Sequence, residues 1–266
     1  MKAIVCVKQV PDTSGKVAVN PDGTLNRASM ATIINPDDKN AVEAALKLKD
    51  ATGCKVVVIT MGPPPAQGML RELIARGADE GVLVSAREFG GSDTFATSQI
   101  LAAAVKKVGL EKDDIVFCGR QAIDGDTAQV GPQIAEKLHL PQVSYVEEVV
   151  EAAADHVVVK RQFEDGYHII KIKTPCLLTA IAELATPRYM SVRGIVEAYE
   201  KEIKVLGFED LKDGLELDMI GLKGSPTNVY QSFTKEVKGA GTILEGLSAD
   251  EAVKAIMDKL EAKFII

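Results

Sequence analysis

A glycine-flanked loop at residues 119–132 has the residue types that could hold a phosphate group. It directly follows an apolar run at residues 114–118, which predicts a buried strand. Glycines let the backbone approach a ligand closely, and the free N–H groups at the start of the next helix would point toward an anion. We interpret the loop as a phosphate cradle, and an ordinary strand-to-helix turn is the alternative.

The start of the helix after this loop has two conflicting signals. Asp126 and Gln129 have the spacing of a capping box, in which each residue satisfies a backbone N–H of the other. Pro132 would interrupt a helix that begins so early, because proline lacks an N–H group. We therefore expect a kink in this helix or a later start.

The sequence offers few groups for acid-base or nucleophilic catalysis. It has no Gly-x-Ser-x-Gly motif, and its three histidines fall in or near predicted turns and a hairpin. Asp124 and Asp126 could form an acid-base pair, but carboxylates in such a loop more often cap a helix or bind a ribose. We predict no catalytic residue. The pattern indicates a binding site whose cofactor supplies the chemistry.

Composition narrows the class of protein. The 266 residues are 46% hydrophobic and 26% charged, and no apolar run is long enough to cross a bilayer. The apolar part of the N-terminus is too short for a secretory signal, so we expect a cytoplasmic protein with no membrane partner. A net charge of −7 and the absence of Trp argue against a nucleic-acid partner.

Four cysteines lie far apart, each in or beside an apolar run: Cys6, Cys54, Cys118 and Cys176. No CxxC pair occurs, so buried and reduced thiols are expected, with no metal site.

Short β-rich runs alternate with helical segments through the first half of the chain. This alternation predicts an α/β fold with a Rossmann-like, open, mainly parallel sheet and helices on both faces. The expected strands are residues 3–7, 55–60, 81–84 and 114–118, and the expected helices follow Pro36, span about 66–76, and run from Asp93 or Thr94 to Gly109.

The second half of the chain has a different pattern. Residues 157–161 and 168–172 flank a turn at 164–166 and predict a β-hairpin, and residues 174–181 predict a further core strand. From residue 183 onward we expect an extended arm. It ends in a helix that begins with a capping box at Ser248 and that either folds back on its own domain or binds a partner subunit.

Four loops rich in Gly, Pro or hydroxyl residues follow the predicted parallel strands. The carboxyl ends of parallel strands lie at one edge of the sheet, where nucleotides bind at a topological switch point. The loops match neither GxGxxG nor a Walker motif, and residues 90–94 resemble a pyrophosphatase loop only superficially. The loops at 8–12, 61–65, 89–94 and 119–132 therefore predict a nucleotide site of another type.

Six short segments, in order along the chain, carry a family resemblance: residues 6–12, 35–36, 60–63, 77–79, 119–124 and 159–176. On these segments the chain resembles the β subunit of electron transfer flavoproteins over essentially its full length. The resemblance implies a heterodimer with an α subunit that carries FAD. It also implies a second nucleotide in the β subunit, which is AMP in simple carriers and a second FAD, reduced by NADH, in electron-bifurcating members.

The resemblance, together with the loops, gives a set of candidate nucleotide contacts. Asp93 and Thr94 are placed beside the flavin ring or the incoming NADH by their position alone. The full set is Cys6, Val7, Asn35, Thr60, Met61, Gly62, Asp93, Thr94, Thr97, Gly119, Gln121, Asp124, Gly125, Asp126, Thr127, Ala128, Gln129, Val130 and Gly131.

Residues 125–132 and 89–98 resemble the bifurcating type more than the simple carriers. Their small side chains would leave room for a pyrophosphate and a flavin. In that type, one electron passes through the α-subunit FAD toward a flavin dehydrogenase of the acyl-CoA or lactate type, and the other passes to ferredoxin or flavodoxin. A simple carrier with a structural AMP is the alternative, and an adenine-nucleotide-binding regulatory module is an alternative from another class.

Residues 185–194 resemble the loop with which the family recognises a partner dehydrogenase. Val192 aligns with the small apolar anchor of that loop, and Tyr189 and Arg193 flank it. A plain interdomain linker is the alternative. The resemblance thus divides the chain into a nucleotide-binding domain at 1–182, a partner-recognition loop and helix at 183–200, and an arm at 201–266 that clasps the α subunit.

Overall fold

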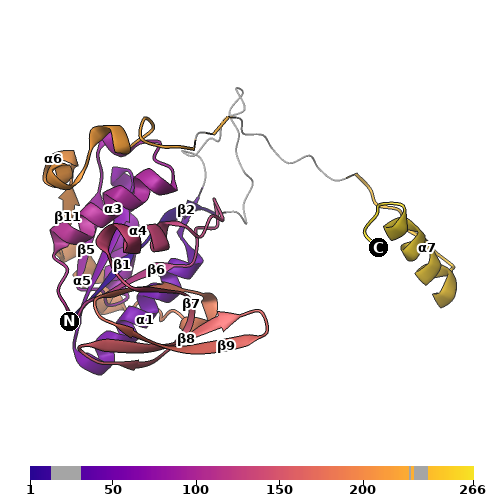
Figure 1. Ribbon diagram of the computed structural model, residues 1–266, viewed down its shortest axis with the longest axis horizontal. Coiled ribbons are helices and arrows are strands. Elements are labelled where there is room, and N and C mark those ends of the chain that lie inside the picture. Colours follow the sequence, from indigo (N-terminus) through magenta and orange to yellow (C-terminus); the bar gives the residue numbers. More distant parts are fainter. Residues whose placement is uncertain (13–30, 228, 231–238) are drawn as a thin grey trace.

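A computed structural model describes residues 1–12, 31–227, 229–230 and 239–266 (Figure 1). Its main element is a nine-stranded sheet in the order β11-β5-β4-β1-β6-β10-β7-β8-β9. The pairs from β11 to β7 are parallel, and β8 and β9 are added in antiparallel orientation. The strands are β1 (Lys2–Cys6), β4 (Lys55–Met61), β5 (Glu80–Val84), β6 (Ile115–Gly119), β7 (Gln142–Ala152), β8 (His156–Phe163), β9 (Gly166–Lys173), β10 (Cys176–Ala180) and β11 (Ile203–Leu206).

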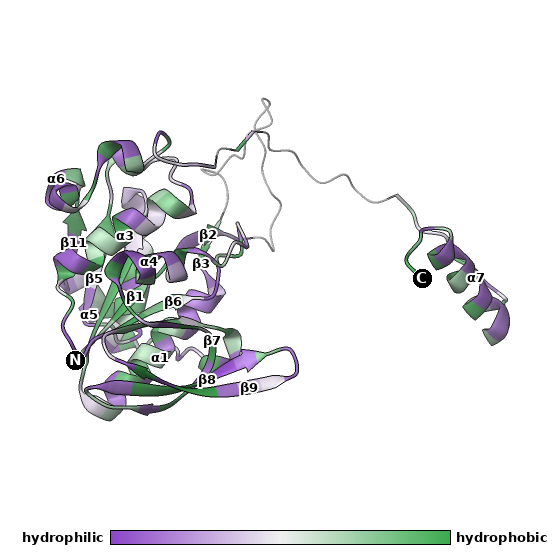
Figure 2. Ribbon diagram, in the orientation of Figure 1, coloured by the Kyte–Doolittle hydropathy of each residue, from purple (hydrophilic) through white to green (hydrophobic). Residues whose placement is uncertain are grey.

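Helices cover both faces of the sheet, as the sequence predicts. Successive side chains of a strand point to opposite faces, so Ala3 and Val5 of β1 join one core cluster while Ile4 and Cys6 join the other. The first cluster is covered by α1 (Pro36–Thr52), α2 (Gln67–Ala75) and α5 (Val192–Glu200), and the second by α3 (Thr94–Val108), α4 (Val130–Leu138) and α6 (Phe208–Leu211). Figure 2 shows the resulting apolar strands in the centre of the body. The α/β fold with a mainly parallel sheet is confirmed.

Most predicted elements are present within a residue or two of their expected bounds. The hairpin is β8 and β9, and the further core strand is β10, which lies between β6 and β7. A small second sheet pairs β2 (Gln9–Pro11) with β3 (Thr32–Ile34). The four cysteines are buried and free of disulfides, as expected.

The capping box expected at Asp126 does not form. Asp126 has a φ of 51° and its carboxylate accepts a hydrogen bond from Gln121 Nε2 at 2.8 Å. The expected later start is confirmed, because α4 begins at Val130. Pro132 then lies in the first turn, where a backbone N–H would have no partner within the helix, so proline costs no helical hydrogen bond there.

Two strands of the sheet were not predicted from the sequence. β7 joins β10 to the hairpin, and β11 pairs in parallel with β5 at the opposite edge of the sheet. The arm therefore starts later than residue 183, because α5 packs on α2 and β11 completes the sheet. The division at residues 182 and 200 stays a prediction.

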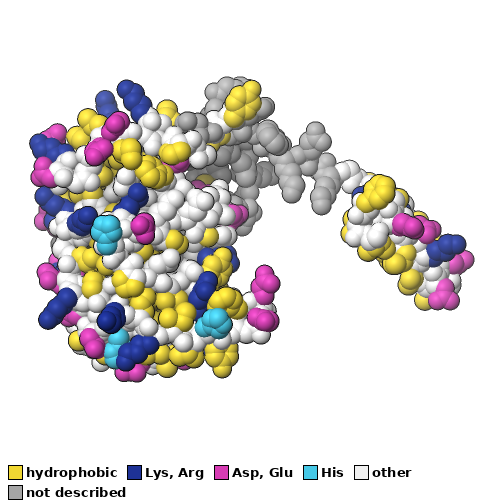
Figure 3. All heavy atoms as spheres, in the orientation of Figure 1, with side chains coloured by type: hydrophobic (Ala, Val, Ile, Leu, Met, Phe, Trp, Pro, Cys, Tyr) yellow, Lys and Arg dark blue, Asp and Glu magenta, His cyan; other side chains and the backbone are white. Residues whose placement is uncertain are grey.

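The C-terminal helix α7 (Ala249–Glu261) begins with the predicted capping box. Glu251 accepts the Ser248 N–H at 2.9 Å, and Ser248 Oγ accepts the Glu251 N–H at 3.4 Å. α7 lies apart from the α/β body and buries none of its residues (Figures 1 and 3). Val253 and Ile256 on its apolar face are each 59% exposed, so α7 does not bury this face against the residues that the structure describes. Among the described residues, no helix combines the length and the apolar character that a membrane crossing requires.

Candidate functional site

The carboxyl ends of the central strands meet at one edge of the sheet. β1 lies between β4 and β6, and the chain leaves β1 through α1 toward β4 but reaches β6 from β5 through α3. The carboxyl ends of β1 and β6 therefore mark the topological switch point of the sheet. Cys6 and Cys118 are register partners at this point. The expectation that the four loops meet at one edge is thereby met by the topology.

Asp38 ties the two strand ends together. This residue of the first turn of α1 is 6% exposed. Its Oδ2 accepts the Lys8 N–H just beyond β1 at 2.7 Å, and its Oδ1 accepts the Gly119 N–H at the end of β6 at 2.9 Å. Burial raises the pKa of Asp38 to about 7, although the two backbone donors favour the ionised form. Gly119 is required for this approach, because a Cβ there would lie 2.3 Å from Asp38 Oδ1.

Asn35 and Lys8 fix the loop that follows β6. Asn35 is buried; its Nδ2 donates to Gln121 O at 2.8 Å, and its Oδ1 accepts the Ile123 N–H at 3.1 Å. Lys8 Nζ donates to both carboxylate oxygens of Asp124, at 2.7 and 2.8 Å. The Asp124 carboxylate is thus paired with Lys8, and this ion pair joins the loop after β6 to the end of β1.

Residues 127–131 form a row of free backbone donors at the start of α4, after the Gly125 and Asp126 N–H groups, which both donate to Ala122 O. Ala128, like Asp126, has a positive φ, of 53°. Within the part of the chain that the structure describes, no acceptor lies within hydrogen-bond distance of the N–H groups of Thr127, Ala128, Gln129, Val130 and Gly131. Unpaired N–H groups at a helix N-terminus provide the donors and the positive dipole end that bind an anion.

The neighbouring strand ends add further candidate contacts to this row. Thr60, at the end of β4, is fully buried, and its Oγ1 has no hydrogen-bond partner among the described atoms. Thr94 Oγ1 donates to Gln129 Oε1 at 2.9 Å, so the start of α3 is joined to the loop before α4. The row of free N–H groups fits a ligand that carries phosphate groups, such as a nucleotide, and Thr60 Oγ1 is a separate unpaired hydroxyl at the end of β4.

The remaining candidate contacts lie around the same edge, in structural roles. Cys6 and Val7 are buried, and the Val7 N–H donates to Ile59 O at 2.8 Å. Met61 ends β4, and the Gly62 N–H donates to Val84 O at 3.1 Å. Thr97 lies in the first turn of α3.

Asp93 is fully engaged by protein groups. Its carboxylate caps α3 by accepting the Ala96 N–H at 3.0 Å, and its other oxygen accepts the Thr227 N–H at 2.9 Å. The side chain therefore joins the start of α3 to Thr227, and the placement of Asp93 beside a flavin ring stays a prediction.

The predicted partner loop lies elsewhere, along the middle of α1. Arg188 donates from Nε to Glu43 at 3.0 Å and from Nη2 to Asp50 at 2.6 Å, and its backbone N–H also donates to Glu43. These carboxylates raise the pKa of Arg188 further above its usual range. Arg76 donates to the Arg188 carbonyl, and Asn40 donates to Ala185 O at 2.6 Å. The segment before α5 is thus held rigidly against the body.

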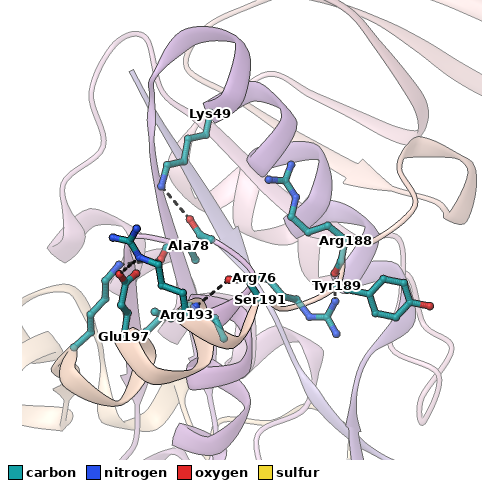
Figure 4. A pocket seen from close by; sticks show the side chains of 13 residues that line it. Lys49, Arg76, Ala78, Arg188, Tyr189, Ser191, Arg193 and Glu197 are labelled. Carbon is teal, nitrogen blue, oxygen red and sulfur yellow. Dashed lines mark hydrogen bonds and ion pairs between the residues drawn. The ribbon is translucent and has the colours of Figure 1, made fainter.

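The side chains that follow this anchor point into solvent. Tyr189 is 96% exposed and Val192 is 81% exposed, while Arg193 pairs with Glu197 one turn along α5. Figure 4 shows Tyr189 directed away from a cavity of about 410 Å³ that lies beside the loop. Five of the thirteen residues that line this cavity are cationic: Lys49, Arg76, Arg188, Arg193 and Lys201.

Comparison with known proteins identifies the family. Residues 22–211 match the model of the electron transfer flavoprotein domain. The chain is 52% identical, over the whole length of both chains, to the electron transfer flavoprotein subunit beta of Clostridium acetobutylicum. This chain belongs to the electron transfer flavoprotein family, as a β subunit.

Two further relatives of this electron transfer flavoprotein subunit also align over their full length. The acryloyl-CoA reductase electron transfer subunit gamma of Anaerotignum propionicum is 64% identical. Subunit CarD of the caffeyl-CoA reductase-Etf complex of Acetobacterium woodii is 51% identical. Family membership implies that the subunit binds a nucleotide and acts in an electron transfer complex.

Sequence reasoning missed three residues that build the nucleotide site of this β subunit. Asp38 joins the ends of β1 and β6, Lys8 binds Asp124, and Ser225 accepts the Asp93 N–H and donates to Gly221 O. Asp38 could have been singled out as a carboxylate in the first turn of a helix at the switch point. Ser225 had no local signal, because its partners lie more than 130 residues earlier in the chain.

Proposed function

We propose that this β subunit binds FAD at the switch point and acts in an electron-bifurcating complex with an α subunit. The observation that carries the proposal is the row of free N–H groups at residues 127–131, beside an open space at Gly125. When bound, the FAD would accept a hydride from NADH and release its electrons singly, to the α-subunit FAD and to ferredoxin or flavodoxin.

The residues of the chain would have the following roles in binding. The N–H groups of Thr127 to Gly131 would donate to the pyrophosphate, with the N-terminal dipole of α4 behind them. Thr60 Oγ1 would pair with a polar group of the nucleotide, and Asn35 and Asp38 would hold the loops in place. No side chain of the set acts as a nucleophile.

AMP in a simple carrier is the second candidate, since it would use the same phosphate donors. FAD is favoured because nothing lies within 4 Å of the position of a Cβ at Gly125, which leaves space beside the cradle. Two relatives are named as parts of acryloyl-CoA and caffeyl-CoA reductases. We therefore propose a flavin dehydrogenase that acts on acyl-CoA esters as the partner, in preference to a lactate dehydrogenase.

Cofactor content tests this proposal. The heterodimer of this chain and its α subunit is purified and denatured, and the released nucleotides are quantified. Two FAD per heterodimer are expected, and one FAD with one AMP would show a simple carrier. A Gly125→Leu variant should lose the second nucleotide and keep the α-subunit FAD, because the leucine side chain would fill the space that the phosphates need. If this variant keeps the second nucleotide in full, residues 125–131 do not bind the phosphates.

Partner recognition is tested separately at Val192. A Val192→Asp variant is expected to lower kcat/KM for electron transfer with the partner dehydrogenase at least tenfold, because an interface anchor of this kind contributes roughly 2 kcal/mol. Nucleotide content should not change. Val205→Asp, at a half-exposed position of β11, is the matched control. If both variants lower kcat/KM equally, residues 185–194 are an interdomain linker and do not recognise the partner.

A further inference from the structure

A segment near the C-terminus is docked on one loop of the nucleotide site. Residues 221–227, here called the latch, lie against the loop between β5 and α3. Gly221 has a φ of 63°, and a Cβ there would lie 2.2 Å from Glu88 O, so the two backbones are in close contact. The Gly221 N–H donates to Ser92 Oγ at 3.1 Å.

Ser225 is the centre of the latch. Its side chain is buried, with the residue 6% exposed, and its hydroxyl uses both of its functions. Oγ accepts the Asp93 N–H at 2.8 Å and donates to Gly221 O at 2.6 Å. A buried hydroxyl with both functions satisfied fixes the groups that it joins, because loss of either contact would leave a buried polar group unpaired.

The same contacts determine where α3 begins. One carboxylate oxygen of Asp93 caps α3 through the Ala96 N–H, and the other accepts the Thr227 N–H from the latch. Thr94, the first residue of α3, donates to Gln129 in the row of free N–H groups. Hydrogen bonds thus join the latch to Asp93, the peptide bond joins Asp93 to Thr94, and a side-chain hydrogen bond joins Thr94 to Gln129 at the phosphate cradle.

We propose that Ser225 is a positioning residue of the nucleotide site: the latch holds Asp93 and the start of α3, and the phosphate cradle has its binding geometry only while the latch is docked. This inference rests on the proposed function, since it concerns the same site. The chain continues from the latch to α7, so the site is connected covalently to a helix that buries none of its residues against the described part of the chain.

The test uses the heterodimer with its α subunit, after removal of the β-subunit nucleotide. Ser225→Ala removes the hydroxyl, and Gly221→Ala displaces the latch by steric contact with Glu88. Each variant is expected to raise the Kd for FAD, or for AMP in a simple carrier, about tenfold, the effect of one good hydrogen bond. The increase in Tm on saturation with nucleotide should shrink in both variants.

Ser98→Ala is the matched control. Ser98 is a buried serine of α3 whose hydroxyl donates only to Phe95 O within its own helix, at 2.7 Å. Its removal should leave the Kd unchanged, and retained α-subunit FAD shows that each variant assembles. Two results for Ser225→Ala and Gly221→Ala would contradict the proposed role of the latch. One is an equal loss of Tm with and without nucleotide, and the other is a Kd within twofold of the wild-type value.

The wild-type protein separates this inference from the proposed function. Uptake of neither FAD nor AMP by the wild-type β subunit would overturn the proposed function and the latch together. Normal uptake by the wild type, with no change in the latch variants, would overturn the latch alone.

Discussion

Replacing Gly119 with alanine is expected to lower the free energy of unfolding by about 3 kcal/mol or more and to abolish nucleotide retention. The new Cβ would lie 2.3 Å from Asp38 Oδ1 and 2.7 Å from Asp38 N, inside the first turn of α1. Backbone atoms cannot move aside as a flexible side chain can, so the cost belongs at the upper end of that found for overpacked cores. The end of β6 would also lose the hydrogen bond from the Gly119 N–H to Asp38.

Urea unfolding and the nucleotide content of the purified heterodimer measure these two effects. Gly125→Ala is the matched control for stability, because it makes the same change in the same loop where nothing lies within 4 Å of the added atom. Its free energy of unfolding should stay within about 0.5 kcal/mol of the wild type. A Gly119→Ala variant as stable as Gly125→Ala would contradict the close contact between β6 and α1.

Asp38 is expected to make the stability of the subunit fall as pH rises from about 4 to about 7. Its ordinary pKa is 3.8, and burial raises the pKa in the folded state to about 7. Between these values the folded protein holds a proton that the unfolded chain has lost, so the free energy of unfolding decreases with pH, by at most about 1.4 kcal/mol per pH unit. The stabilisation from this group is therefore complete below pH 4 and lost once pH passes 7.

Asp38→Asn separates this contribution from those of other groups. Asparagine does not titrate, and its NH₂ group would face one of the two backbone donors. At pH 4 to 5 the variant should be about 1–3 kcal/mol less stable than the wild type, and by pH 8 the difference should vanish or reverse in sign, because the wild type loses up to about 1.4 kcal/mol per pH unit over roughly three units. Urea unfolding across this pH range measures the difference, with Asp165→Asn in the exposed hairpin turn as control. A constant difference at every pH would contradict the raised pKa.

The parallel sheet could be predicted from the sequence because its strands are short, apolar and separated by helical segments. β1, β4, β5 and β6 each have this form, and each loop after them contains turn residues. β7 was not predicted because only one face of it is buried, and Glu147, Glu148 and Glu151 interrupt the apolar pattern. β11 has four residues in a charged region, and its partner β5 lies about 120 residues earlier, so no local pattern indicates the pairing.

The phosphate cradle was predicted from glycines and from the expected helix start, which are local signals. The residues that hold the cradle in place were not predicted, because they form hydrogen bonds to residues far away in the sequence. Asn35 was predicted only as a nucleotide contact, and no local pattern indicated that its side chain holds residues 121 and 123. Asp93 was predicted only from its position, and no local pattern indicated that its carboxylate joins α3 to Thr227.

Helix α1 connects the nucleotide-site edge of the sheet to the exposed loop before α5. Near its N-terminus Asp38 holds the ends of β1 and β6, and along its length Glu43 and Asp50 hold Arg188. At a rise of 1.5 Å per residue, Asp38 and Glu43 are about 7.5 Å apart along the axis, and a helix does not stretch. A tilt of α1 that breaks the contacts of Asp38 would also move Glu43 and Asp50. The distance between the strand ends and the loop at Arg188 is therefore set by the length of this one helix.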